Sequence, residues 1–165
     1  MPRFLPILLS LALLVPRGAV AQYAATQDAS LRGLRRVTLY VSVNADDLPA
    51  DSATALAERV RIELGKAGLI LVPELAEPPI RPEAIVRVAL NSTARGRWVD
   101  DLSLRLQVEQ TATIPRTGDA LRMVTWYTEY NDIDIAAAEL PAHARVLVDR
   151  GLNRFLKAWL AVNAH

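Results

Sequence analysis

The sequence predicts an α+β fold: a two-layer sandwich of order β-α-β-β-β-β-α, with a mixed sheet and both helices on one face. Three observations predict it. Residues 102–108 alternate apolar and polar side chains without a break, as a strand with one buried face does. Two other segments carry apolar residues at helical spacing. Several short apolar runs, separated by turn residues, lie between those segments. Such a sandwich leaves the second sheet face in water.

The first residues have the layout of a secretory signal peptide. Arg3 supplies a positive charge, residues 4–15 form an apolar run, and Ala19-Val20-Ala21 is a small-residue cleavage site. The run is shorter than the ~20 residues that span a membrane. We expect a cleaved signal peptide at 1–21, a flexible leader at 22–30 and one domain at 31–165, periplasmic or secreted. The alternative is an uncleaved amphiphilic anchor.

Composition narrows the function classes. Cleavage removes Arg3 and Arg17, so the 19 Lys and Arg residues fall by two against 18 Asp and Glu. A nearly neutral mature chain lacks the electrostatic support that a nucleic-acid partner requires. The chain has 0 cysteines, which rules out disulfides and a lipid-modified cysteine. The hydrophobic core must therefore stabilise the domain without disulfides.

The first half of the domain predicts a strand, a helix and a second strand. Residues 37–43 alternate as a strand with one apolar face. Asp51 or Ser52 is expected to cap the following helix, and Gly68 to end it in a left-handed conformation. Residues 69–72 predict a parallel strand reached by a right-handed crossover. The proline-rich loop 73–82 is expected to be stiff and structural.

The second half predicts a meander and a final helix. Residues 84–90, 98–113 and 121–130 are expected to form three antiparallel strands with turns at 91–97 and 115–119. Pro141 suits the first turn of a helix that runs to about residue 162. Gly151 lies on the apolar stripe of that helix, which indicates a close approach to the sheet rather than a break.

The water-exposed sheet face is the candidate binding surface. Arginine and tyrosine are the residues most often found at binding hot spots. Glu109 and Glu129 could instead pair with the arginines across strands, which would leave an ordinary solvated face. A free strand edge could also accept a partner's strand and form a homodimer. The candidate binding residues are Tyr40, Arg87, Ser103, Arg105, Gln107 and Tyr127.

Few residues could support catalysis or metal binding. His143 and His165 are the only histidines, and no nucleophile elbow, zinc spacing or glycine-rich phosphate loop is present. Asp132 and Asp134 could begin an oxygen-ligand metal site, but the glycine and distal glutamate of a calcium loop are missing. These two aspartates are weak metal candidates, and no cofactor is predicted.

Two stretches resemble known proteins. Residues 31–34 (Leu-Arg-Gly-Leu), Thr125-Trp126-Tyr127 and 147–163 resemble a family of small uncharacterised exported bacterial proteins. The order of elements is similar to the amino-terminal domain of the periplasmic translocation protein TolB. These resemblances imply an envelope domain but no catalytic residue, because a shared architecture does not confer function.

The sequence therefore predicts a non-enzymatic periplasmic domain that binds a protein partner or a small envelope ligand. No nucleic acid is expected as a partner, and no membrane span after signal cleavage. The alternative is a small metal-dependent hydrolase that uses the loop aspartates.

Overall fold

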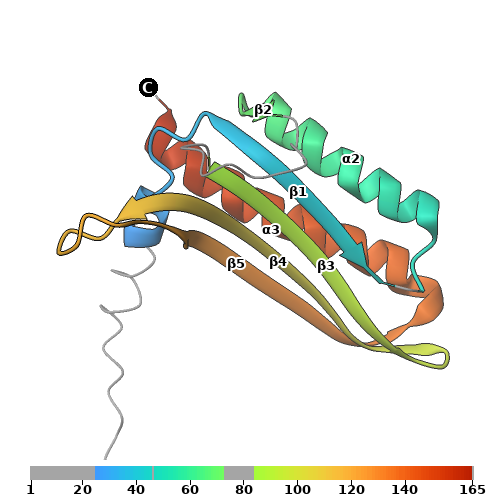
Figure 1. Ribbon diagram of the computed structural model, residues 1–165. Coiled ribbons are helices and arrows are strands. Elements are labelled where there is room, and N and C mark those ends of the chain that lie inside the picture. The colour runs from blue at the N-terminus through green and yellow to red at the C-terminus, as the bar shows by residue number, and fades with distance from the viewer. Residues whose placement is uncertain (1–24, 46, 73–83, 165) are drawn as a thin grey trace, which may run out of the picture.

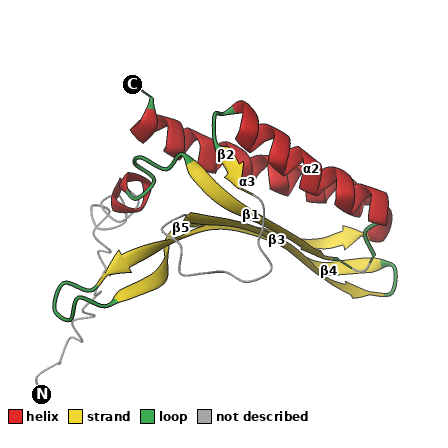
Figure 2. Cartoon of the chain, turned by 45° about the horizontal axis from the view of Figure 1, so that its top comes forward, coloured by secondary structure: helices red, strands yellow, loops and turns green. Residues whose placement is uncertain are grey.

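The computed structural model describes residues 25–45, 47–72 and 84–164. Their arrangement confirms the predicted α+β sandwich: one five-stranded mixed sheet, of order β2-β1-β3-β4-β5, carries both long helices on one face (Figure 1, Figure 2). The predicted signal peptide and the proline-rich loop 73–82 lie outside the described residues.

The parallel part of the sheet centres on β1 (Arg36–Asn44). Strand β3 (Ala84–Arg95) pairs with β1 along its length, from Val37 opposite Ala84 to Asn44 opposite Asn91. On the other side, β2 (Ile70–Val72) is parallel to β1 as predicted, but it covers only the first three residues of β1. Among the described residues, no strand pairs with the remainder of that edge.

The predicted meander is confirmed: the middle strand has its predicted bounds, while the two flanking strands are longer than expected. Strand β4 (Trp98–Thr113) is antiparallel to both β3 and β5 (Ala120–Ala136). The predicted turn at 91–97 narrows to the residues around Gly96, whose φ is 63°. Strand β5 continues past residue 130 because residues 131–136 pair with the first part of β4.

Helix α2 (Ala50–Lys66) begins earlier than its predicted cap. Pro49 is the N-cap residue, with φ −54°, and Asp51 lies inside the first turn, where its Oδ1 accepts a hydrogen bond from the Ser52 amide. The capping prediction for Asp51 or Ser52 is therefore wrong. The predicted end is confirmed: Gly68 has φ 99°, and the Leu69 amide donates to the Leu64 carbonyl.

Helix α3 (Leu140–Asn163), preceded by the short 3₁₀ helix η1 (Ala137–Glu139), supplies the largest part of the helical layer. Pro141 lies in its first turn as predicted. Gly151 is buried directly against Leu104 of β4, which confirms the predicted close approach.

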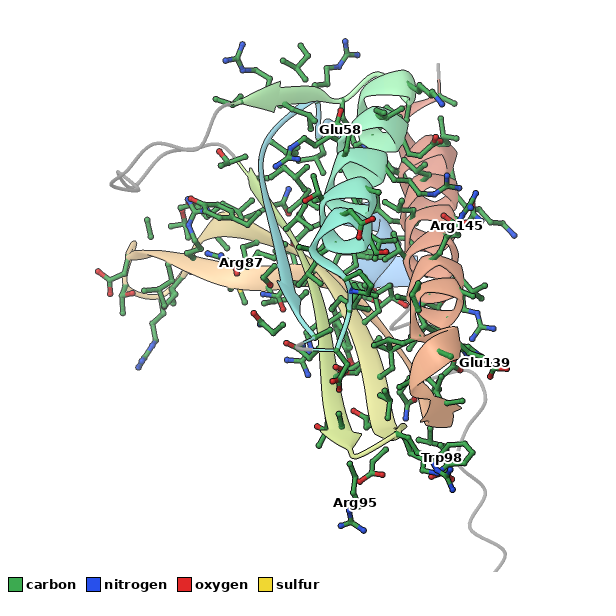
Figure 3. All side chains as sticks on the ribbon, turned by 90° about the vertical axis from the view of Figure 1, so that its right-hand side faces the viewer. Glu58, Arg87, Arg95, Trp98, Glu139 and Arg145 are labelled. Atoms are coloured by element: carbon green, nitrogen blue, oxygen red, sulfur yellow. The ribbon has the colours of Figure 1, made fainter. Side chains whose placement is uncertain are left out.

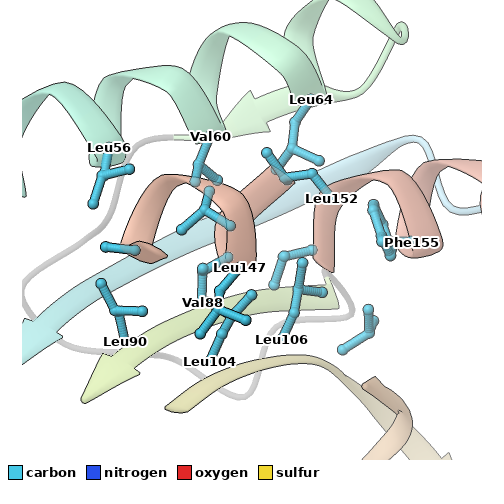
Figure 4. Close-up of a cluster of buried hydrophobic side chains, with 14 of the residues drawn as sticks. Leu56, Val60, Leu64, Val88, Leu90, Leu104, Leu106, Leu147, Leu152 and Phe155 are labelled. Carbon is cyan, nitrogen blue, oxygen red and sulfur yellow. The ribbon is translucent and has the colours of Figure 1, made fainter. Parts of the chain in front are cut away.

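The core lies between the sheet and the two helices (Figure 4). The four apolar residues of the alternating stretch in β4, namely Leu102, Leu104, Leu106 and Val108, are all fully buried. Trp126 of β5 meets Phe155 of α3 edge to face, with ring centroids 5.3 Å apart. One sheet face is thus committed to packing, and the other is left for contact with solvent or partners.

Part of the predicted flexible leader is ordered against the domain. Residues 25–29 form a short helix beside β5. Ser30 Oγ donates to the Thr125 carbonyl at 3.0 Å, and Gln27 Nε2 donates to the Tyr127 carbonyl at 2.9 Å. These bonds, together with the Asp28 contacts described below, explain why this part of the leader takes a defined position.

Candidate functional site

The sheet face away from α2 and α3 is called the outer face below. The register aligns Tyr40, Arg87, Gln107 and Tyr127 in one row across β1, β3, β4 and β5. Arg105 lies in the next row, opposite Ala89 and Glu129, and Ser103 in the row after it. The structure therefore brings all six predicted binding residues to one face; their binding role stays a prediction.

Arg87 organises the middle of this row. Its guanidinium lies over the Tyr40 ring, 4.6 Å from the centroid, and its Nε is 2.6 Å from Glu109 Oε1. Gln107 Nε2 donates to the same carboxylate oxygen at 2.9 Å. Glu109 keeps only 15% of its side chain exposed, so these contacts are partly shielded from water. Arg87 is held in place rather than free to move, and Figure 3 shows it on the outer face.

Arg105 forms the second ion pair of the outer face. Its Nη2 lies 3.1 Å from Glu129 Oε1 and 3.2 Å from Oε2, across the β4–β5 pair. The side chains are 55% and 45% exposed, so the pair adds little stability. The cross-strand pairing that the sequence left open is therefore what the structure shows, and Arg87 and Arg105 are each neutralised by a carboxylate.

A depression of about 480 Å³ opens beside the row. Tyr40, Ser42, Arg87, Arg105 and Gln107 line it from the outer face, while Leu39 and Val41 line it from the opposite side of β1. Arg61 of α2 also reaches it. The depression therefore wraps around the edge of β1 that β2 leaves open.

The outer face continues onto apolar side chains of β5. Tyr127 is 46% exposed, and Val124, opposite Glu109, is also 46% exposed. Leu121 and Met123, further along the β4–β5 hairpin, are each 52% exposed, but they pair with Ala112 and Gln110 and lie on the other side of the hairpin from Val124. Exposed apolar groups next to an ordered polar row are typical of a protein contact surface.

The helical layer holds a second depression, of about 510 Å³, between the first halves of α2 and α3. Arg59 lies at its edge and forms an ion pair with Asp149 of α3. The hydrogen bond from Arg59 to Asp149 and the negative charge of Asp149 raise the pKa of Arg59. The arginine therefore stays charged and paired with Asp149.

The two weak metal candidates do not form a joint site. Asp132 belongs to the buried side of β5, opposite Leu102, and its Oδ2 lies 3.0 Å from His143 Nδ1. Asp134 is exposed, and its φ of 56° is unusual for a residue other than glycine. Across the described residues, no group of three or more histidine or acidic side chains is placed to hold a metal ion.

The sequence reasoning missed Arg61 and Glu58 of α2, which flank the open edge of β1. Their spacing marks only an exposed helix face, and which strand that face overlies depends on the tertiary arrangement. The shortness of the predicted second strand was the one sequence feature that pointed to an open edge of β1, because a strand as short as β2 cannot cover that whole edge.

Comparison with known proteins places the chain in no family. No protein-family model and no curated protein matches it. Among solved structures, it is similar to a PelC dodecamer from Paraburkholderia phytofirmans, with 13% identity over 76% of this chain and 90% of that one and a TM-score of 0.44. Rare lipoprotein B from Shewanella oneidensis matches with 14% identity, 77% and 95% coverage and a TM-score of 0.34.

A minor lipoprotein from Acinetobacter baumannii matches at a similar level, with 14% identity, 79% and 93% coverage and a TM-score of 0.36. Two of these three structure neighbours are bacterial lipoproteins by name. The resemblance to TolB stays a prediction. In the part of the chain that the structure describes, no helix is both long and apolar enough to cross a bilayer.

Proposed function

We propose that this chain is a non-enzymatic interaction domain of the bacterial envelope that binds a protein partner through its outer face. The observation that carries the proposal is the row from Tyr40 to Tyr127, an ordered polar array on a sheet face that no described helix covers. The predicted signal peptide supports a location outside the cytoplasm.

The array is suited to binding because its side chains are already ordered. Arg87 is fixed between the Tyr40 ring and Glu109, and Glu109 also accepts a hydrogen bond from Gln107. A partner that meets fixed side chains loses less conformational entropy on binding than one that must order them. Tyrosine and arginine also supply large contact areas with polar ends.

The charges of the outer face favour a protein over an anionic small ligand. Arg87 and Arg105 are each paired with a glutamate, so an anion would have to displace a carboxylate to reach either guanidinium. A protein partner can instead contact the mixed polar row together with the exposed Tyr127 and Val124. A neutral envelope ligand in the depression beside Tyr40 is the alternative.

The test begins with site-specific photocrosslinking in intact cells. A photoreactive residue at Tyr127 should capture a defined envelope protein, whereas the same residue at Lys157, exposed on α3, should not. The captured protein is then purified, and its affinity for the double variant Arg105→Ala/Tyr127→Ala is measured. We expect affinity to fall at least tenfold, because hot-spot residues each contribute about 1–2 kcal/mol or more.

The matched control is Arg145→Ala/Lys157→Ala, which removes an equal number of exposed side chains from the helical layer. It should bind as the unmodified protein does. Equal capture from Tyr127 and Lys157, or unchanged affinity of a folded Arg105→Ala/Tyr127→Ala variant, would rule out the outer face as the binding surface.

A further inference from the structure

The edge of β1 opposite β3 is open over most of its length. Strand β2 pairs only with Arg36, Val37 and Thr38, while β1 continues to Asn44. No described strand covers residues 39–44 on that side, and Figure 1 shows β2 at one end of β1 only. An open edge presents unpaired N–H and C=O groups, which is a template for another strand.

The direction of these groups follows from one hydrogen bond. The Ile70 amide donates to the Arg35 carbonyl at 2.8 Å, so Arg35 directs its backbone polar groups toward the β2 side. Alternate residues of a strand direct their groups to the same side. Leu39, Val41 and Val43 therefore present their N–H and C=O groups at the open edge.

The apolar and polar side chains of residues 39–43 alternate in the same order from either end of the segment. Leu39, Val41 and Val43 face the helices and are only partly buried, while Tyr40 and Ser42 face the other way. An antiparallel copy of the same strand would place apolar opposite apolar and polar opposite polar. The edge is thus complementary to itself.

We infer that two copies of this chain pair through their β1 edges, antiparallel and related by a two-fold axis at Ser42, to form one continuous sheet. In this register Val41 of each copy lies opposite Val43 of the other, and these are the residues whose polar groups point outward. Tyr40 lies opposite Asn44. A register centred on Val41 would bring Asn44 to the level of Thr38, where Val72 of β2 already sits.

The charges on α2 support a second copy as the occupant. Arg61 lines the same depression as Ser42, and its Nη1 lies 3.6 Å from Glu58 Oε2, with the two side chains 54% and 59% exposed. Figure 3 shows Glu58 on the flank of α2 that lies toward β1. This flank of α2 therefore carries one acidic and one basic group, so two copies would meet there without a net repulsive charge.

Cysteine crosslinking tests the register, because the chain has 0 cysteines of its own. Residues at the axis of a non-hydrogen-bonded antiparallel pair have Cα atoms about 4.5 Å apart, within the range that a disulfide bridges. Under mild oxidation, Ser42→Cys should form a covalent dimer. Asn44→Cys, exposed on the same side of the same strand, should stay uncrosslinked because its two copies would lie roughly 14 Å apart.

Charge reversal tests the contact between the helices. The protein, expressed from its full sequence and purified, should sediment as a dimer at micromolar concentration. Arg61→Glu leaves four acidic side chains, two from each copy, on the two α2 flanks and should raise the dimer dissociation constant at least tenfold, while Glu58→Arg/Arg61→Glu restores neutrality and dimerisation. A monomeric unmodified protein, or equal crosslinking of Ser42→Cys and Asn44→Cys, would overturn the inference.

Amide hydrogen exchange shows whether a second copy or another segment of the same chain covers the open edge of β1. In the dimer, the Val41 and Val43 amides should exchange slowly, and dilution to the monomer should release them. Slow exchange of these amides in a monomer would mean that another segment occupies the edge, which also overturns the inference. Arg105 and Tyr127 take no part in this contact, so its outcome is separate from that of the proposed partner-binding face.

Discussion

Gly151 is the residue at which helix α3 comes closest to the sheet. A Cβ atom added there would lie 2.6 Å from Leu104 Cδ2, and Leu104 is fully buried. Gly151→Ala should therefore destabilise the protein by about 1–3 kcal/mol, as overpacking of a filled core does. Urea unfolding followed by circular dichroism measures the change.

Gly65 is the matched control, because it lies within α2 and an added Cβ meets nothing within 4 Å. Gly65→Ala should be neutral or stabilise the protein by up to about 1 kcal/mol through helix propensity. A stabilising effect at Gly151 equal to that at Gly65 would show that α3 does not press against Leu104.

At the residue scale, alternation alone predicted which side chains share the outer face. Once Leu102, Leu104 and Leu106 are assigned to the core, Ser103 and Arg105 must point the other way. Alternation does not give the register between strands. An ion pair between Glu109 and an arginine could therefore be predicted, but not that the arginine is Arg87. The choice of arginine depends on the register between β3 and β4.

One acidic residue links the short helix at 25–29 to both β5 and α3. Asp28 accepts a hydrogen bond from the buried Trp126 indole at 2.9 Å and from Arg154 Nη2 at 2.9 and 3.1 Å. Asp28→Ala should cost about 1–3 kcal/mol, because the Trp126 N–H loses its partner in a partly buried site. Thermal unfolding of the two proteins provides the measurement.

Asp100→Ala is the matched comparison for this acidic residue. Asp100 lies 3.5 Å from Arg95, whose side chain is 87% exposed, so its removal should change stability by no more than about 0.5 kcal/mol. Equal losses for the two substitutions would mean that Asp28 contributes no more than a solvated ion pair.

At the element scale, the strands and long helices were predictable but the docked leader was not. Residues 25–30 are small and polar with no periodic pattern, so nothing in them indicates burial. Their position depends on acceptors and donors from β5 and α3, about a hundred residues further along the chain. The extra length of β5 was missed for a similar reason, since only pairing with β4 makes residues 131–136 a strand.

At the scale of the whole molecule, two helices must keep a fixed relation over one sheet. The core between them is apolar, and Leu56, Val60 and Leu64 of α2 are buried with Leu147 and Leu152 of α3. Apolar contacts tolerate sliding better than directed polar ones do. A single ion pair between the helices can therefore fix their alignment, and with it the geometry of the open β1 edge beneath α2.

Arg59 and Asp149 form that ion pair, with Arg59 Nε 2.5 Å from Asp149 Oδ1 and both side chains about one-third exposed. The pKa of Arg59 is raised, first by this hydrogen bond and then by the charge of Asp149. A raised pKa of a basic group means that its contribution to stability is fully present below the ordinary arginine pKa and is lost only when pH rises through the folded value. A double-mutant cycle of Arg59→Met and Asp149→Asn should therefore give the same coupling at about pH 7 and about pH 10. Coupling that vanishes by the higher pH would require a different titrating group to hold α2 against α3.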